Sequence, residues 1–130
     1  MKKLALLLLL LMVSLSAHAG WTFVRSEQQN RTVYIDFSTK RKIGKIVKIW
    51  HMADYSTPLV INDKPYNSVK SLYEYDCGNF KFRLQTVIAY SLNMGGGEVV
   101  GTDTGDSPWE DVVPETHGAS DYKLMCNPKK

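Results

Sequence analysis

Residues 68–92 alternate polar and apolar side chains along most of their length. Successive side chains of a β-strand point to opposite faces of a sheet, so a period of two predicts half-buried strands and not helices. We expect one strand at 68–77 and a second at 81–92, joined by a hairpin turn at Gly78-Asn79. The sequence therefore predicts an antiparallel sheet.

The phase of the alternation assigns the side chains to faces. One face of the second strand is expected to be apolar, and its members are Phe82, Leu84, Ile88, Tyr90 and Leu92. In the first strand the shared face holds Val69, Tyr73, Tyr75 and Cys77. The opposite faces are rich in charged residues, which is typical of an antiparallel sheet with one side in water.

Shorter segments elsewhere complete the expected fold. Strands are predicted at 21–25, 32–37, 43–50 and 98–102. Gly44 would permit a bulge near the start of the third of these strands. Turns are predicted at 62–65 and 95–97, a loop at 102–107, and helical turns only at 108–113 and 119–126. The predicted fold class is mainly β (α+β): a single antiparallel sheet of about six strands with a short C-terminal helix.

The N-terminus has the three parts of a secretory signal peptide. Two lysines precede an apolar run at 4–13, and small residues follow before Gly20. We expect cleavage between Ala19 and Gly20, which gives a signal peptide of residues 1–19 and one domain of residues 20–130. The alternative is an uncleaved anchor, but the apolar run is shorter than the about 20 residues that span a bilayer. No transmembrane segment is expected in the mature chain.

The charge balance of the mature domain is nearly even. The chain has 16 basic and 13 acidic residues, but Lys2 and Lys3 belong to the expected signal peptide. A nucleic-acid-binding domain normally has a strong excess of positive charge. The composition therefore predicts no nucleic-acid partner.

Cys77 and Cys126 are the only cysteines of the chain. In an exported domain of this size an even number of cysteines predicts a disulfide bond. The alternatives are a reactive thiol or a metal ligand, but neither cysteine has a CxxC partner or a nearby histidine. A bridge between them would stabilise the fold by about 4 kcal/mol on the chain-entropy model.

No set of side chains predicts catalysis, a metal site or a cofactor. His51 and His117 have no acidic residue at a zinc-ligand spacing, and no serine stands in a GxSxG motif. The glycines at 95–97 are followed by strand-forming residues and not by the Lys-Ser or Lys-Thr of a phosphate-binding loop. The acidic residues at 103–111 lack EF-hand spacing. We expect a protein that is not an enzyme.

One cluster of charge remains as a candidate binding site. Its five cations lie within nine residues and are Lys40, Arg41, Lys42, Lys45 and Lys48. Such a cluster would attract a sulfated polysaccharide, an acidic protein or an anionic membrane surface. The alternative interpretation is an edge strand whose lysines prevent aggregation.

Tyr34 and Trp50 are the aromatic residues most relevant to binding. Their phase in the strands is opposite to that of their apolar neighbours, such as Val33 and Ile49. Most other aromatic residues are needed in the core of so small a domain. Aromatic residues on an open sheet face would instead mark an interface.

Several short motifs occur in one order through nearly the whole mature chain. They are Val33-Tyr34-Ile35-Asp36, Val47-Lys48-Ile49-Trp50 with Asp54-Tyr55, Tyr73-Glu74-Tyr75-Asp76-Cys77, Met94-Gly95-Gly96-Gly97 with Val99-Val100, Trp109 with Val112-Val113-Pro114, and Met125-Cys126. In this set the chain resembles the surface-adhesin protein E family of Gram-negative bacteria. The resemblance implies an exported protein with a single antiparallel sheet and a helix, which often self-associates.

The resemblance also implies a function. An adhesin of this family binds host matrix and serum proteins such as laminin, vitronectin and plasminogen, so we expect an exported binding module with a protein or polysaccharide ligand. It would act in the periplasm or on the cell surface of a Gram-negative bacterium. The alternative is a periplasmic structural domain that forms a homodimer or binds another envelope component.

Overall fold

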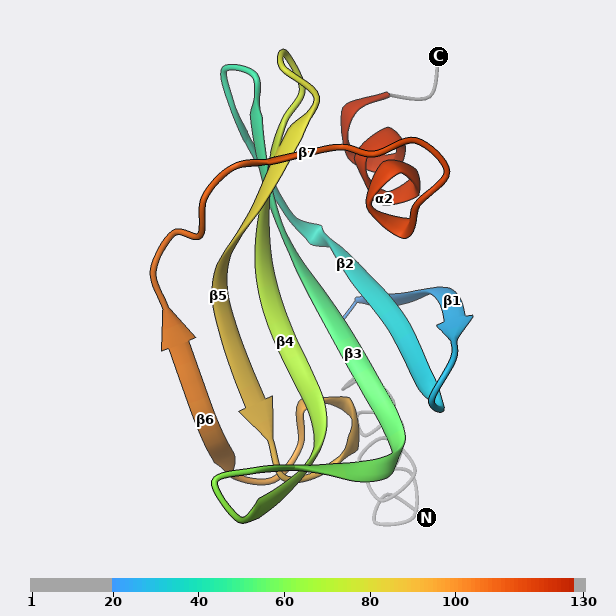
Figure 1. The fold of residues 1–130 in the computed structure, drawn as a ribbon, viewed down its shortest axis with the longest axis vertical. Helices are drawn as coiled ribbons and strands as arrows, with labels where there is room; N and C mark the ends of the chain where they lie inside the picture. The colour runs from blue at the N-terminus through green and yellow to red at the C-terminus, as the bar shows by residue number, and fades with distance from the viewer. Residues whose placement is uncertain (1–19, 128–130) are drawn as a thin grey trace, which may run out of the picture.

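The computed structural model describes residues 20–127, which form one antiparallel sheet and a C-terminal helix (Figure 1). Its strands are β1 (Trp21–Glu27), β2 (Arg31–Ile43), β3 (Ile46–Ile61), β4 (Lys64–Asp76), β5 (Lys81–Tyr90), β6 (Val99–Thr104) and β7 (Glu110–Asp111). The helices are the 3₁₀ turn η2 (Asn93–Gly95) and α2 (His117–Cys126). The expected signal peptide and Ala19 of its cleavage site lie outside the described residues.

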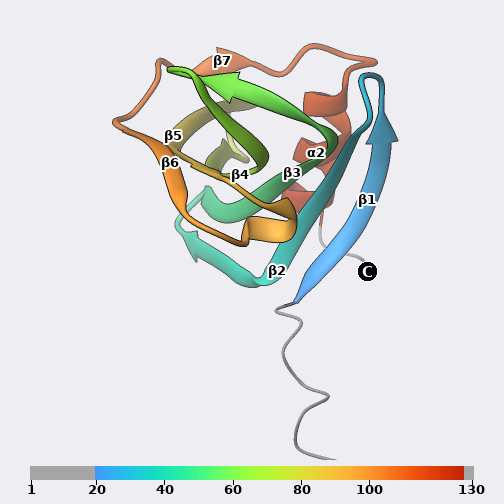
Figure 2. The ribbon, with the colours of Figure 1, turned by 90° about the horizontal axis from the view of Figure 1, so that it is seen from below.

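The strands follow one another in space as they do in sequence. The order in the sheet is β1-β2-β3-β4-β5-β6, all neighbours are antiparallel, and the short β7 pairs with the start of β5. Figure 2 shows that the sheet is strongly curled and not flat. The predicted fold class is confirmed.

The turns before and after β3 contain residues with left-handed backbone conformation. Gly44, with φ of 60°, forms the turn between β2 and β3 together with Lys45. The predicted strand at 43–50 is confirmed from Ile46 onward, where β3 begins. The predicted bulge at Gly44 is wrong, because the chain reverses there. Asn62 and Asp63, with φ of 49° and 62°, form the next turn, and this two-residue left-handed geometry suits the twist of the paired strands.

A bulge in β5 divides its apolar residues between the two faces of the sheet. Tyr73 of β4 pairs with Leu84, but the preceding residue, Leu72, pairs with Thr86, so Gln85 is an extra residue in β5. An extra residue reverses the alternation beyond it. The single apolar face predicted for residues 82–92 is wrong for that reason.

The last part of the chain also differs from the prediction. Residues 108–113 contain the strand β7 and not a helical turn, and β6 extends through the first part of the predicted loop. Asp111 of β7 pairs with Lys81, whose Nζ lies 2.7 Å from Asp111 Oδ1. The helix starts at His117, two residues before the predicted start.

The face of the sheet that carries α2 is called the helix face, and the other is called the open face. Directly opposite residues of paired strands share a face. The core lies on the helix face and consists of Ile35, Val47, Ile49, Tyr75, Tyr122 and Met125. A disulfide bond joins Cys77, just after β4, to Cys126 of α2, as predicted. The disulfide bond thereby ties α2 to the sheet over this core.

Thr116 caps the N-terminus of α2, and its hydroxyl accepts a hydrogen bond of 3.1 Å from the Ala119 amide. A cap of this kind contributes about 1 kcal/mol to helix stability. Between residues 20 and 127, no helix has the length and apolar character to cross a membrane.

Candidate functional site

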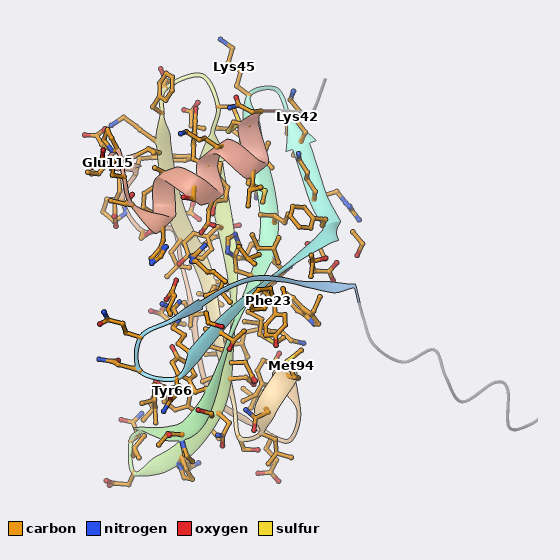
Figure 3. All side chains as sticks on the ribbon, turned by 90° about the vertical axis from the view of Figure 1, so that its right-hand side faces the viewer. Phe23, Lys42, Lys45, Tyr66, Met94 and Glu115 are labelled. Atoms are coloured by element: carbon orange, nitrogen blue, oxygen red, sulfur yellow. A yellow bond between two sulfur atoms is a disulfide. The ribbon has the colours of Figure 1, made fainter. Side chains whose placement is uncertain are left out.

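The five predicted cations come together in the hairpin that β2 and β3 form. Lys40, Arg41 and Lys42 lie at the end of β2, Lys45 lies in the turn, and Lys48 lies on β3 opposite Arg41. Figure 3 shows Lys42 and Lys45 at one end of the molecule and Tyr66 near the other. These five residues are called the cationic hairpin.

Only one member of the cationic hairpin has an ion-pair partner among residues 20–127. Lys48 Nζ lies 3.3 Å from Glu74 Oε1. Glu74 is 3% exposed and also pairs with Arg83 at 3.1 Å, so Lys48 helps to neutralise a buried carboxylate. The other four cations are exposed. Their charge is available to a ligand.

Trp50 lies on the open face, as its phase predicts, and lines a hollow of about 310 Å³. This open-face hollow is lined by Trp21, Asp36, Thr39, Trp50, Lys70, Ile88 and Tyr90. The Trp50 amide donates a 3.1 Å hydrogen bond to Thr39 Oγ1, which fixes the backbone at the floor of the hollow. Trp50 and Thr39 also line a shallower depression with Arg41 and Lys48. Trp50 and Thr39 therefore lie between the hollow and the cationic hairpin.

The side chain of Lys70 is held by two aromatic rings of the hollow and by the close approach of Gly95. Its ammonium lies 4.9 Å from the centre of the Tyr90 ring and 5.8 Å from that of Trp21. Gly95, with φ of 72°, approaches so closely that a Cβ there would lie 2.5 Å from Lys70 Cε. Gly95 therefore allows η2 to pack against the lysine stem, and the rings attract its charge.

The structure does not bring Tyr34 to the hollow. Its ring packs edge-on against Phe23 of β1, with the ring centres 6.2 Å apart. Phe23 is 58% exposed. Tyr34 and Phe23 thus form an aromatic pair on the open face, and this pair is separate from Trp50.

A second cavity, of about 240 Å³, lies on the helix face beside α2. Arg25 binds both carboxylate oxygens of Asp121 at 2.7 and 3.2 Å, and Glu27 pairs with Arg25 and Arg31. The charges of this cavity therefore largely satisfy one another. They connect β1 to α2 and favour a structural role.

His51 is a buried titratable group of this second cavity. It is 6% exposed, and its Nε2 lies 3.1 Å from the Tyr75 hydroxyl. Burial lowers the pKa of His51 to about 4, although the carboxylate of Asp121 acts in the opposite direction. His51 is therefore neutral at physiological pH.

The family model for surface-adhesin protein E matches residues 21–127. The chain belongs to the surface-adhesin protein E family. The match covers nearly all of the described residues, so the sheet, the hollow and α2 are all parts of the family domain.

Solved structures of Haemophilus influenzae protein E have the same fold. Crystal form II matches with a TM-score of 0.68 and 14% identity, covering 85% of this chain and 90% of that chain. A second structure of protein E matches with a TM-score of 0.66 and 16% identity, covering 85% and 86%. Among curated protein sequences, none matches this chain.

In this member of the surface-adhesin protein E family, sequence reasoning missed most of the open-face hollow. Its missed residues are Trp21, Asp36, Thr39, Lys70, Ile88 and Tyr90. Asp36 shares the strand phase of Tyr34, which is a local signal that would have placed it on the same face. Tyr90 had no such signal, because the bulge at Gln85 reverses its side.

Proposed function

We propose that this chain is an exported, non-enzymatic binding module that holds an acidic segment of a protein or polysaccharide with its cationic hairpin. Membership of a surface-adhesin family supports the proposal. The observation that carries it is the set of four exposed cations that have no ion-pair partner within residues 20–127. Extracellular matrix and serum proteins are the proposed class of ligand, and the signal peptide would provide export.

The physical basis of this binding is electrostatic. Positive charges that are close together raise the local concentration of an anionic partner, and the effect extends over about 8 Å at physiological ionic strength. The shallow depression beside Trp50 adds an aromatic surface to the same region. Binding is therefore expected to weaken steeply as salt is added.

The test compares two variants with the same change of net charge. The first carries Lys40→Gln, Lys42→Gln and Lys45→Gln, and leaves Lys48 in place because it neutralises Glu74. The control carries Ser56→Glu and Lys64→Glu, which are exposed positions at the far end of β3 and at the start of β4.

The expected result is that the hairpin variant elutes from immobilised heparin at lower salt and binds immobilised laminin or vitronectin more weakly. The control should behave as the unmodified protein does. Equal retention of both variants, or an equal loss in both, would contradict a role for the cationic hairpin. Unfolding curves establish that both variants fold.

A second proposal is a periplasmic structural domain that self-associates or binds an envelope partner. It is favoured by the two ends of the sheet, since β1 and β6 have no strand on their outer sides among the described residues. Unpaired strand edges are templates for pairing with another chain. The two proposals place the mature domain on different sides of the outer membrane.

A further inference from the structure

The open-face hollow contains one carboxylate and one ammonium that have unused hydrogen-bonding capacity. Asp36 is 8% exposed, and its Oδ1 accepts a 3.0 Å hydrogen bond from the Ser38 amide. Its Oδ2 has no hydrogen-bond or ion-pair partner within residues 20–127, and neither has Lys70 Nζ. Asp36 lines the hollow, and its Oδ2 therefore keeps its capacity to accept a hydrogen bond from a ligand.

The charges of the two groups balance. Asp36 and Lys70 line the same space, yet they do not form an ion pair with each other. An anionic ligand would be opposed by Asp36, and a cationic ligand by Lys70. The hollow therefore favours a neutral ligand with hydroxyl groups, which can donate to the carboxylate and accept from the ammonium.

The rings of Trp21, Trp50 and Tyr90 define the remaining wall. Aromatic faces bind apolar surface, and binding pockets combine such faces with a few polar groups that fix orientation. A pyranose ring has C–H groups on its faces and hydroxyl groups around its rim. The volume of about 310 Å³ is at the lower end of the range for ligand pockets, which suits a single ring.

We propose that the open-face hollow binds one neutral pyranose unit of a glycan. The sugar ring lies against Trp50, one hydroxyl donates to Asp36 Oδ2, and another accepts from Lys70 Nζ. This site is separate from the unpaired cations proposed above to hold an acidic ligand. It gives the domain a second contact with a glycosylated surface, for a ligand without net charge.

Trp109 lies outside the hollow and serves as an internal control in a spectroscopic test of binding. Trp21 and Trp50 line the hollow, whereas Trp109 lies under the guanidinium of Arg83, 4.4 Å from the ring centre. The three indole N–H resonances in a two-dimensional NMR spectrum therefore report two positions inside the site and one outside it.

The probes are the methyl glycosides of galactose, glucose and N-acetylglucosamine, with methyl glucuronide as an anionic comparison. At least one neutral glycoside should shift the Trp21 and Trp50 resonances in a saturable way and leave Trp109 unchanged. No saturable shift with any neutral glycoside would overturn the proposal. An equal or stronger effect of the glucuronide would also overturn it, because the site would then select for an anion.

Two variants test the assigned contacts. Asp36→Asn keeps the acceptor for Ser38 but removes the free carboxylate oxygen, and Lys70→Met keeps the stem but removes the ammonium. Each should weaken glycoside binding by about tenfold, as expected for the loss of one charge-assisted hydrogen bond. Lys64→Met is the matched control and should bind normally. Unchanged affinity in both test variants would overturn the proposal.

The cationic-hairpin variant separates this proposal from the previous one. With Lys40, Lys42 and Lys45 changed to glutamine, heparin retention should fall while the glycoside shifts persist. If heparin retention were unaffected by the hairpin variant, the acidic-ligand proposal would fail and the sugar site would stand. Loss of the glycoside shifts in this variant would contradict a separate sugar site.

Discussion

At the scale of single residues, His51 is a buried imidazole whose pKa is strongly lowered. It lies under α2 between aromatic rings, and the centre of the Tyr73 ring is 4.7 Å from its own. The acid Asp121 and the bases Arg25 and Arg31 all act on it, but burial has the largest effect on its pKa. The folded protein therefore holds the neutral imidazole, and the unfolded chain takes up a proton more readily.

The depressed pKa of His51 predicts a pH dependence of stability. The group titrates near 6.5 in the unfolded chain and at about 4 in the folded state, so its effect is absent above pH 6.5. As pH falls from 6.5 to 4, the free energy of unfolding should decrease by about 3 kcal/mol.

Urea unfolding at several pH values measures this change. In the His51→Gln variant the glutamine amide can still form a hydrogen bond with the Tyr75 hydroxyl. The decrease in the free energy of unfolding between pH 6.5 and pH 4 should be lost in this variant. Parallel stability profiles of the variant and the unmodified protein across this interval would show that His51 is not responsible.

At the scale of elements, α2 depends on its contacts with the sheet. It has 10 residues, and isolated helices of this length are only marginally stable in water. The disulfide bond to Cys77 holds its end, the Arg25–Asp121 ion pair holds its middle, and the Tyr122 hydroxyl donates a 3.2 Å hydrogen bond to the Asp76 carbonyl.

Removal of the disulfide should therefore destabilise α2 first. The bond closes a loop with a sequence separation of 49. Its loss in the Cys77→Ser, Cys126→Ser variant should reduce the free energy of unfolding by about 4 kcal/mol on the chain-entropy model.

Urea unfolding measures the total loss, and hydrogen exchange shows where it occurs. Amides of α2 should exchange faster in the double variant than those of β3 and β4 at the centre of the sheet. The unmodified protein in the presence of a reductant is the control and should behave in the same way. Equal α2 exchange with and without the bond would show that the ion pair and the core contacts suffice.

At the scale of the whole molecule, the two faces of the sheet have different roles. The helix face buries the apolar core beneath α2, and the open face keeps a hollow and an exposed aromatic pair. Two of the unpaired cations, Lys42 and Lys45, lie at one end of the molecule (Figure 3). This separation leaves the proposed ligand sites free of the groups that hold the fold together, except for Lys48.

The location of the domain in the cell decides between the two proposed functions. If it binds host ligands, protease and antibodies should reach it on intact cells. If it is a periplasmic structural domain, it should be protected until the outer membrane is permeabilised. A known periplasmic protein in the same cells is the control for membrane integrity, and protection on intact cells would contradict the host-ligand proposal.

Much of the fold could be predicted because its determinants are local. Alternating side chains predicted at least part of each of the six main strands, and turn-forming residues predicted the turn at 62–65 and the hairpin at 78–79. The second half of β3 and the short β7 were not predicted. The count and context of the cysteines predicted the disulfide bond. Each of these features depends on residues close together in the sequence, or on a pairing with no alternative.

The tertiary structure alone decided where the functional surfaces lie. Gln85 is an extra residue because β4 pairs with the residues before and after it, and Ile88 and Tyr90 therefore point to the open face. This pairing register cannot be inferred from the local sequence. The open-face hollow is lined by side chains from five strands, β1 to β5. Lys48 forms an ion pair with Glu74 on the neighbouring strand β4, so its charge is neutralised. The sequence by itself determined where the six main strands lie, since alternation is a local property, but it did not identify β7. Cross-strand pairing and the curl of the sheet determined which side chains meet, since both act between residues far apart in the chain.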